Sequence, residues 1–289
     1  MVRIIESLDD IAPNYDVLFC DLWGCLHNGQ VAYPAAVAAL QRFRQGGGRV
    51  VLLTNAPRPA KFVAEQLKRL HVPDDAWDAI VSSGDAAQDA MFAGAVGRKV
   101  WAISPEKDEV FFSDVPPEWA DAPAIERVPL DQAEGIVCTG PFDENVDVPS
   151  DYRAQFLYAR EKGMKLLCAN PDIVVDLGDR RIICAGALAE YYTEMDGTSL
   201  YFGKPHPPIY DLARRKMNLG PDARVLAIGD GINTDVLGGE QEGLNVLFVT
   251  GGLAFDQFGP DVEHPELPLL EDWLKTEARN PTYAIGRLR

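Results

Sequence analysis

Several apolar runs in this chain end on polar residues whose types could carry out catalysis. Asp21 follows the run VLFC, and Asp230 lies just beyond the run RVLAIG. Thr54 ends the run RVVLLT and precedes Asn55, and Lys204 comes shortly after the run LYF. In an open parallel sheet, ligands bind beyond the carboxyl ends of the strands. We therefore expect these side chains to face one crevice.

The charges of this set indicate a metal site. Asp235 lies one turn beyond Asp230, so three carboxylates, including Asp21, would share the crevice with the Lys204 ammonium. Uncompensated carboxylates raise one another's pKa and destabilise a fold. One divalent cation together with Lys204 would balance all three charges, and oxygen ligands favour Mg²⁺. Such a site can hold a phosphate group against a carboxylate nucleophile by neutralising both.

The elements that must position these residues alternate between strand and helix. The runs are continuously apolar, which is typical of parallel strands covered on both faces. Helical patterns lie between them, for example from Pro34 to Gly46, where Val37, Leu40 and Phe43 share one face. Short alternating units predict an α/β fold, a doubly wound Rossmann-like parallel sheet.

The middle of the chain differs from its two ends. Residues 86–185 are looser and richer in Pro and acidic residues, yet they hold further strand candidates, KVWAI, GIVCTG and KLLCAN. We interpret this segment as an α/β cap domain inserted into a core domain formed by residues 1–85 and 186–289. We also expect Ser150 to cap a helix in the insertion, and a helix plus a trailing segment after Leu270.

Composition excludes several classes of function. The 289 residues hold 27 Lys and Arg against 44 Asp and Glu, a formal net charge of −17. A nucleic-acid or anionic-membrane partner needs a basic face, so we expect neither. No run reaches the length of a membrane span, and there is no signal-peptide core. The five cysteines are widely spaced without a CxxC pair, which favours a reducing cytoplasm over a disulfide framework.

Four segments in this order resemble the motifs of the haloacid-dehalogenase-like (HAD) hydrolase superfamily. They are DLWGCLHNG (21–29), LLTNAPRP (52–59), GKPHPPIYDLA (203–213) and GDGINTDVLGGEQEGL (229–244). The large insertion, with ANPD followed by CAGAL, resembles class IIA, the group of NagD-like sugar phosphatases, nucleotide phosphatases and p-nitrophenyl phosphatases. The resemblance covers nearly the whole chain, and it implies a Mg²⁺-dependent phosphatase of a small phosphorylated metabolite.

The resemblance also implies roles for the catalytic residues. Asp21 would attack phosphorus and form an aspartyl-phosphate. Thr54 and Asn55 would bind the transferring phosphoryl group, and Lys204 would neutralise it. Asp235 would hold either Lys204 or the water molecules of the metal.

The metal and the substrate would have further contacts. The family pattern implies Mg²⁺ bound by Asp21, Asp230 and the backbone carbonyl of Trp23. Asn170 and Asp172, at the end of an insertion strand, are candidates for facing the substrate, although a Pro-Asp turn would also explain them. The cap would close over the crevice and select the leaving group. Caps of this type often pair, which adds a homodimer to the expectations.

One position departs from the family pattern. Phosphatases of the superfamily usually have a second Asp two residues after the nucleophile, where this chain has Trp23. That Asp protonates the leaving oxygen and later activates water, and indole cannot do either. Three interpretations follow: a phosphatase that is slow, restricted to good leaving groups or served by another acid such as His27; a phosphate-ester sensor with little turnover; and a metal-independent haloacid dehalogenase.

Overall fold

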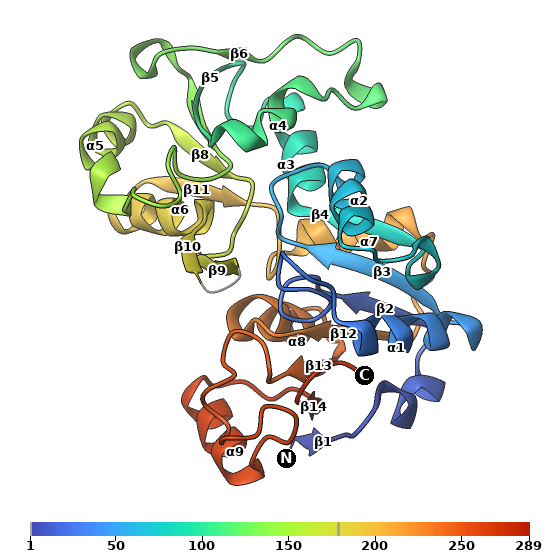
Figure 1. Cartoon of the computed structure of the whole chain (residues 1–289). Helices are drawn as coiled ribbons and strands as arrows, with labels where there is room; N and C mark the ends of the chain where they lie inside the picture. Colours follow the sequence, from blue (N-terminus) through green and yellow to red (C-terminus); the bar gives the residue numbers. More distant parts are fainter. Residues whose placement is uncertain (1, 178–179) are drawn as a thin grey trace.

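The computed structural model describes residues 2–177 and 180–289 and contains two parallel β-sheets, one in each half of the molecule (Figure 1). Met1, at the start of the predicted core segment, and residues 178–179, inside the predicted insertion, lie outside the described residues. The α/β class and the doubly wound parallel sheet predicted from the sequence are confirmed.

The larger sheet has seven strands in the order β1-β14-β13-β12-β2-β3-β4, and all neighbouring strands are parallel. The strands are β1 (Arg3–Ile4), β2 (Val17–Cys20), β3 (Arg49–Thr54), β4 (Ala79–Ser82), β12 (Val225–Gly229), β13 (Asn245–Val249) and β14 (Tyr283–Ile285). Strand β2 lies at the centre, and its four residues are all buried.

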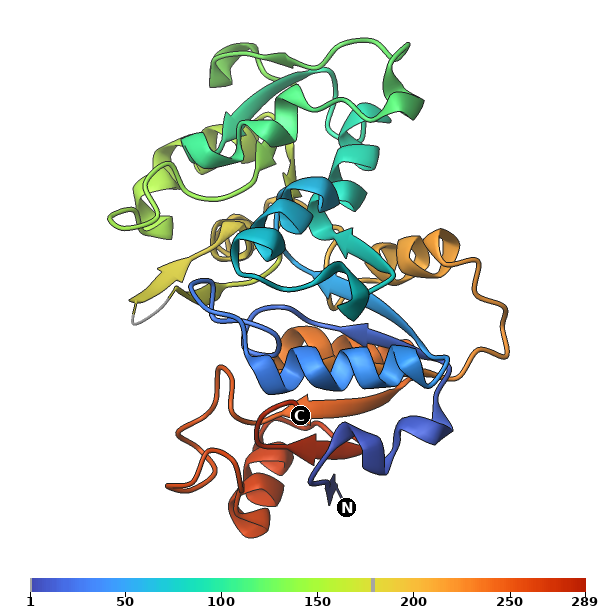
Figure 2. The ribbon, with the colours of Figure 1, turned by 45° about the vertical axis from the view of Figure 1, so that its right-hand side comes forward.

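Helices cover both faces of this sheet, which explains the unbroken apolar runs (Figure 2). Leu18 of β2 packs in the cluster beneath α1 (Pro34–Gln45) and α2 (Ala60–Arg69), whereas Phe19 packs in the cluster beneath α7 (Pro207–Lys216). The second face is completed by α8 (Leu237–Gln241) and α9 (Leu267–Thr276). Successive residues of each strand point to opposite faces of the sheet, and both faces are covered by helices, so apolar residues follow one another along the strands.

The order of the strands creates a switch point at the centre of the sheet. From β2 the chain continues to β3 on one side, whereas β12 pairs with β2 on the other side and continues outwards to β13. Asp21 follows β2 and Asp230 follows β12, so both lie at the carboxyl edge beside this switch point. Ligands of open α/β sheets bind in such a crevice.

The second sheet has five parallel strands in the order β11-β8-β7-β5-β6. They are β5 (Lys99–Ile103), β6 (Glu126–Arg127), β7 (Gly135–Cys138), β8 (Lys165–Cys168) and β11 (Thr198–Tyr201). Its helices are α3 (Ser83–Phe92), α4 (Val110–Ser113), α5 (Arg153–Glu161) and α6 (Ala185–Glu194). An antiparallel hairpin, β9 (Val174–Leu177) with β10 (Arg180–Ile183), projects from this half towards the larger sheet (Figures 1 and 2).

The pairing of β11 bears on where the insertion ends. Strand β11 pairs with β8 of the second sheet, and α6 packs on the same sheet, although the sequence suggests a boundary at residue 185. The run LYF (200–202) falls within the segment that the sequence analysis assigned to the core, because three apolar residues do not indicate which sheet they join. We propose that the inserted domain extends through Tyr201 and that α3 crosses its other boundary near residue 86.

One local prediction needs correction: Ser150 does not cap a helix, because it lies inside a 3₁₀ turn (Pro149–Tyr152) that leads directly into α5. Near the end of the chain, a helix (α9) is followed by a trailing segment, as predicted, and this segment contains β14, which pairs with both β13 and β1 in the core sheet. All five cysteines are free and buried.

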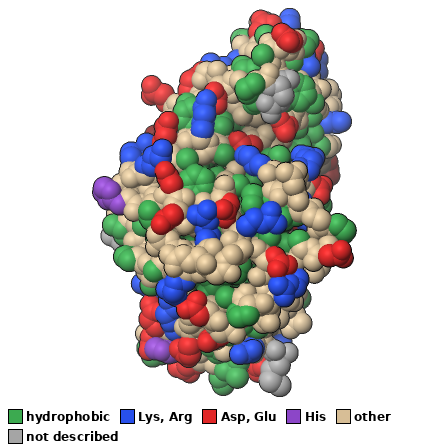
Figure 3. Space-filling view, turned by 90° about the vertical axis from the view of Figure 1, so that its right-hand side faces the viewer, with side chains coloured by type: hydrophobic (Ala, Val, Ile, Leu, Met, Phe, Trp, Pro, Cys, Tyr) green, Lys and Arg blue, Asp and Glu red, His purple; other side chains and the backbone are tan. Residues whose placement is uncertain are grey.

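The face drawn in Figure 3 has no large area of a single charge, because acidic and basic side chains are interspersed on it. In the part of the chain that the structure describes, some charged side chains form ion pairs, such as Arg214 with Glu242 at 2.5 Å. Among the described residues, no helix is long and apolar enough to cross a bilayer.

Candidate active site

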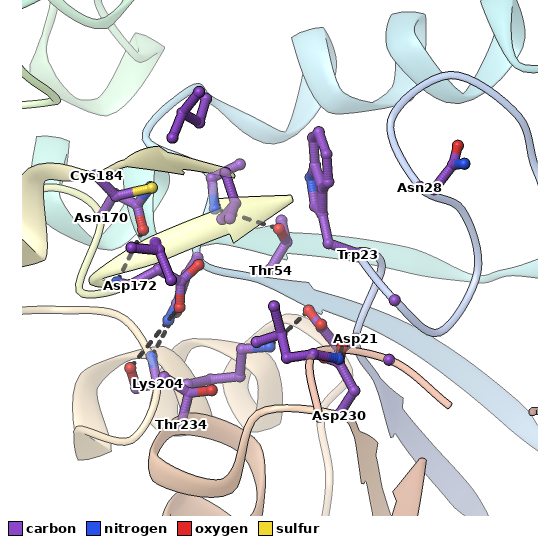
Figure 4. Close-up of a pocket in the computed structure, with 18 of the residues that line it drawn as sticks. Asp21, Trp23, Asn28, Thr54, Asn170, Asp172, Cys184, Lys204, Asp230 and Thr234 are labelled. Atoms are coloured by element: carbon purple, nitrogen blue, oxygen red, sulfur yellow. Dashed lines mark hydrogen bonds and ion pairs between the residues drawn. The ribbon is translucent and has the colours of Figure 1, made fainter. Parts of the chain in front are cut away.

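All the site residues predicted from the sequence line one pocket between the two sheets (Figure 4). The pocket has a volume of about 380 Å³. The predicted residues that line it are Asp21, Trp23, Thr54, Asn55, Asn170, Asp172, Lys204, Asp230 and Asp235. They come from five separate segments of the chain, which the carboxyl edges of the strands bring together.

The Lys204 ammonium lies at the centre of this group. Its Nζ donates to Asp21 Oδ1 and to Asp235 Oδ1, each at 2.6 Å, and the Lys204 side chain is only 3% exposed. Asp235 is held in turn by the backbone N–H of Gly231, which donates to its second oxygen at 3.1 Å. The loop before α7 and the π-helical turn after β12 therefore fix one cation against the carboxylate that follows β2.

Burial and crowding shift the pKa values of the carboxyl groups upwards. Desolvation is the largest cause and raises the pKa of Asp21 to about 7, with Lys204 opposing the shift and Asp235 adding to it. Desolvation, followed by the charge of Asp21, raises the pKa of Asp230 well above its usual value. Burial disfavours the Lys204 charge, but the carboxylates around it outweigh this cost and raise its pKa. The site holds more negative charge than its one ammonium can balance.

Asp230 provides the second half of a cation site. Ligand atoms of Asp21, Cys25 and Asp230 all lie within 4.8 Å of one another, and all three residues are buried. The backbone N–H of Leu253 donates to Asp230 Oδ2 at 2.8 Å and orients its carboxylate. Two buried carboxylates with raised pKa values and surplus charge are a donor set that fits a hard divalent cation.

Gly24 is required for this close approach. Its φ is +75°, and a Cβ atom at this position would lie 1.9 Å from Asp230 Oδ2. Only glycine both tolerates the left-handed backbone and leaves space for the carboxylate. The spacing from Asp21 to Gly24 is thus a geometric requirement of the site.

The side chain of Asn55 makes three hydrogen bonds to other parts of the protein. Its Nδ2 donates to Asp172 Oδ1 at 2.8 Å and to the Lys204 carbonyl at 3.0 Å, and its Oδ1 accepts from the Lys204 N–H at 2.7 Å. The side chain thereby ties the insertion to the core and fixes the backbone of Lys204. Thr54 Oγ1 accepts from the Ala56 N–H at 3.2 Å, so its hydroxyl proton is free to face the pocket.

The two insertion residues have different surroundings. Asn170 Oδ1 accepts from the Asp172 N–H at 3.0 Å, so this side chain shapes the Pro-Asp turn that the sequence left as an alternative. Desolvation raises the pKa of Asp172 to about 6, with Lys204 acting against the shift. Both residues still line the pocket.

Trp23 stands above Asp21 with its indole directed towards the upper part of the pocket (Figure 4). Its other side packs against His27, with ring centroids 5.2 Å apart and an interplanar angle of 75°. His27 is fully buried, accepts a hydrogen bond from the Gly29 N–H at 3.1 Å, and has a pKa lowered by desolvation to about 4. This geometry contradicts the alternative in which His27 supplies the proton, because His27 does not line the pocket.

The outer wall of the pocket includes residues that the sequence patterns do not indicate. One part is charged: Arg58 lies 3.6 Å from the buried Asp108, and Lys107 pairs with Glu144 at 2.6 Å. Another part is apolar and comprises Val174, Val175, Ile182, Leu253 and Phe255. Lys107, Asp108 and Glu144 lie in a Pro- and acid-rich segment that resembles ordinary surface, so only the folded chain reveals them. Arg58 lies in the second motif, where its sequence leaves open a substrate contact or an ion pair with a surface acid.

Comparisons with known proteins agree with this architecture. Residues 18–115 match the family described as haloacid dehalogenase-like hydrolase, and residues 201–285 match a second family, described as HAD hydrolase-like. A crystal structure of a haloacid dehalogenase-like hydrolase from Brucella suis 1330 is 36% identical, with a TM-score of 0.84 over 99% of this chain and 100% of that one. The chain belongs to the haloacid dehalogenase-like hydrolase family.

Two relatives indicate the class to which this HAD hydrolase belongs. Glycerol-3-phosphate phosphatase of Gallus gallus is 28% identical over 86% of the chain and 84% of the relative. Ribonucleotide monophosphatase NagD of Escherichia coli K12 is 26% identical over 82% of the chain and 88% of the relative. With these relatives and its inserted parallel sheet, the HAD hydrolase falls in class IIA, so the predicted enzyme class is confirmed.

The carboxylate cluster predicts how the stability of this HAD hydrolase depends on pH. The pKa of Asp21, about 7, lies above its unfolded value of about 4, so its contribution to stability is present below pH 4 and is lost as pH rises through 7. Asp172, with a pKa of about 6, acts in the same direction. We expect Mg²⁺ to raise Tm more at pH 8 than at pH 5 in calorimetry. Equal shifts at the two pH values would contradict the cluster.

A matched variant isolates Asp21 in the same measurement. Asp21→Asn removes one buried charge and leaves Asp235 to pair with Lys204. We expect this variant to be more stable than the wild type at pH 8 without metal, by about 1–3 kcal/mol, and to gain less from Mg²⁺. Destabilisation under those conditions would show that the carboxylate is not under electrostatic strain.

A pair of glycine variants tests the cation site directly. Gly24→Ala and Gly163→Ala both place a side chain at positive φ, +75° and +67°, and this backbone conformation alone should cost each variant about 1 kcal/mol of stability. Only Gly24→Ala collides with Asp230, because nothing lies within 4 Å of the Gly163 position. We expect about tenfold or greater loss of Mg²⁺ affinity for Gly24→Ala alone, measured by calorimetric titration. The same affinity in both variants would exclude Asp230 as a ligand.

Proposed function

We propose that the protein is a Mg²⁺-dependent phosphoric monoester hydrolase that acts on a small phosphorylated metabolite through an aspartyl-phosphate on Asp21. One observation carries the proposal: the Asp21 carboxylate faces the pocket, 2.6 Å from the Lys204 ammonium and beside Asp230. A nucleophile, a cation for the phosphoryl oxygens and a second carboxylate for a metal thus lie within one buried group. The similarity to glycerol-3-phosphate and nucleotide phosphatases supports the same chemistry.

In the first step, a carboxylate oxygen of Asp21 would attack phosphorus, and the bond from phosphorus to the leaving oxygen would break. Lys204 would stabilise the charge on the phosphoryl oxygens, together with the Thr54 hydroxyl. Asp235 would hold Lys204 in place, as its 2.6 Å contact does here. The departing oxygen would take its proton from water. In the second step, water would attack the phosphorus of the aspartyl-phosphate, releasing inorganic phosphate and restoring Asp21.

Asp21 and Asp230, with the backbone carbonyl of Trp23, are the groups that would hold the Mg²⁺ ion. When bound, the ion would supply positive charge that neutralises the carboxylates and the phosphoryl group. The insertion would cover the crevice, and the Asn55–Asp172 hydrogen bond would connect its position to the phosphoryl site. A volume of about 380 Å³ is in the range of small-molecule sites. We place this reaction in the cytoplasm because the five cysteines are free.

A phosphate-ester sensor with little turnover is the second candidate. Trp23 favours it, because indole at this position offers no acid or base. The metal-independent haloacid dehalogenase ranks third, because the crowding of Asp21, Asp230 and Asp235 around one ammonium calls for a further cation.

A phosphatase screen tests these candidates together. We expect Mg²⁺-dependent release of phosphate from p-nitrophenyl phosphate, whose leaving group needs little protonation, and a loss of about 10³-fold or more in Asp21→Asn. Because that substitution relieves charge crowding, its inactivity would not reflect unfolding. Tight ester binding without release would favour the sensor, and halide release from a 2-halo acid without metal would favour the dehalogenase.

A further inference from the structure

Asp172 is held by hydrogen bonds that leave one of its carboxyl oxygens available. Asn55 Nδ2 donates to Asp172 Oδ1 at 2.8 Å, and the Asp172 N–H donates to Asn170 Oδ1 at 3.0 Å. The other oxygen, Oδ2, has no hydrogen-bond partner within the described part of the chain, and it is not enclosed by protein. Because Asp172 lines the pocket, Oδ2 is open to a bound ligand.

The turn that carries Asp172 packs closely against its neighbours. A Cβ atom on Gly186, in α6, would lie 2.4 Å from the Asp172 carbonyl oxygen, and a Cβ atom on Gly203 would lie 2.7 Å from Pro171 Cδ. Gly203 directly precedes Lys204, so the turn is packed against the segment that provides the ammonium of the site. These close contacts fix the Asp172 carboxyl group relative to Lys204.

Asp172 and the proposed nucleophile face the pocket from different sides. Asp172 belongs to the insertion and Asp21 to the core, and Figure 4 shows them on opposite walls. They are near enough for the charge of Asp172 to contribute to the raised pKa of Asp21. In phosphoryl transfer the attacking and leaving oxygens lie roughly in line, so the leaving oxygen points away from the nucleophile. Asp172 therefore lies on the side where that oxygen departs.

The Asp172 carboxyl group can exchange a proton near neutral pH. Desolvation raises its pKa to about 6, with Lys204 acting against the shift and Asp235 adding to it. Asp21 and Cys184 are the other titratable groups whose pKa values its charge raises. A proton donor is most effective when its pKa lies near the operating pH.

Asp108 is a second carboxyl group of the pocket with a pKa raised to about 6, again chiefly by desolvation. Its Oδ1 has no hydrogen-bond partner among the described residues, and Arg58 lies 3.6 Å away. The charges that act on it most are those of the outer wall, Lys107, Arg58 and Glu144, and not those of the phosphoryl site. Asp108 is therefore a matched control: a protonatable carboxyl group in the same pocket but away from the reacting atoms.

We propose that Asp172 is the general acid and base of this phosphatase and takes the part that the second Asp plays in the family pattern. This inference rests on the proposed function and adds a catalytic residue to it. When Asp21 attacks phosphorus, the bond to the leaving oxygen would break, and that oxygen would take the proton of Asp172 Oδ2 and not a proton directly from water. The Asp172 carboxylate would then take a proton from the water molecule that attacks the aspartyl-phosphate. Phosphate would leave, and both carboxyl groups would return to their starting states.

The dependence on the leaving group tests the acid. Asp172→Asn keeps an oxygen that can accept from Asn55, but it has no acidic proton to donate. With Mg²⁺, we expect kcat/KM of this variant to fall at least about 10²-fold for benzyl phosphate, whose alkoxide needs a proton. We expect a change of less than about threefold for p-nitrophenyl phosphate, whose phenolate leaves without one.

The second step tests the base. Without the Asp172 carboxylate, water attacks the aspartyl-phosphate more slowly, so the intermediate accumulates. We expect Asp172→Asn to release p-nitrophenol in a burst of about one equivalent per protein molecule, followed by a slower steady rate. A steady rate equal to that of the wild type, without a burst, would overturn the role as base.

The control and the wild type separate this inference from the proposed function. Asp108→Asn should preserve the ratio of kcat/KM for the two esters, and a selective loss for benzyl phosphate in this variant would overturn the assignment to Asp172. Equal losses for both esters in Asp172→Asn would indicate a structural role, and no loss would exclude proton transfer. Release by the wild type from p-nitrophenyl phosphate alone would overturn the acid but not the phosphatase. No Mg²⁺-dependent release from either ester would overturn the phosphatase assignment itself.

A rescue experiment places the acid at its position in the family pattern. Adding Trp23→Asp to Asp172→Asn should restore kcat/KM for benzyl phosphate by at least about tenfold, with little change for p-nitrophenyl phosphate. No recovery in a folded double variant, with its Tm checked by calorimetry, would show that the lost function is not proton transfer. If the double variant does not fold, the single variants still decide the question.

Discussion

The structure depends on one buried ammonium group held between two carboxylates. Lys204 bridges Asp21 and Asp235 at 2.6 Å each, and the residues it joins are 183 and 31 positions away in the chain. A buried charge without a partner is costly, so the Lys204 ammonium stays buried only while at least one of these carboxylates pairs with it. Because the cluster carries surplus negative charge, it favours the binding of a cation and reactions that neutralise a carboxylate.

The parallel sheet makes this cluster geometrically available. Asp21 and Asp230 follow adjacent strands at the switch point, and Gly24 lets the two carboxylates approach. The insertion closes the pocket from the other side, where Asp172 reaches Asn55 of the core. Trp23, in place of the Asp of the family pattern, leaves the arrangement of these carboxylates unchanged. It alters only the proton transfers that the pocket can support.

Much of this organisation was accessible from the chain alone, because polar residues at strand ends and continuous apolar runs have direct physical causes. The position of β11 and the hydrogen bonds of Asn55 were not accessible, since a three-residue run and an amide side chain suit several partners equally well. The buried Asp108 also gave no signal, because its neighbours are charged and resemble solvated surface. Packing between distant segments decides such cases, and local patterns do not record it.

The central claim is that the Asp21 carboxylate attacks phosphorus. Mass spectrometry of protein quenched in acid during turnover of an aryl phosphate with Mg²⁺ tests it most directly. We expect one added phosphoryl group on the peptide that contains Asp21, and none in Asp21→Asn. Rapid turnover without that adduct, or a phosphoryl group on another residue, would contradict it.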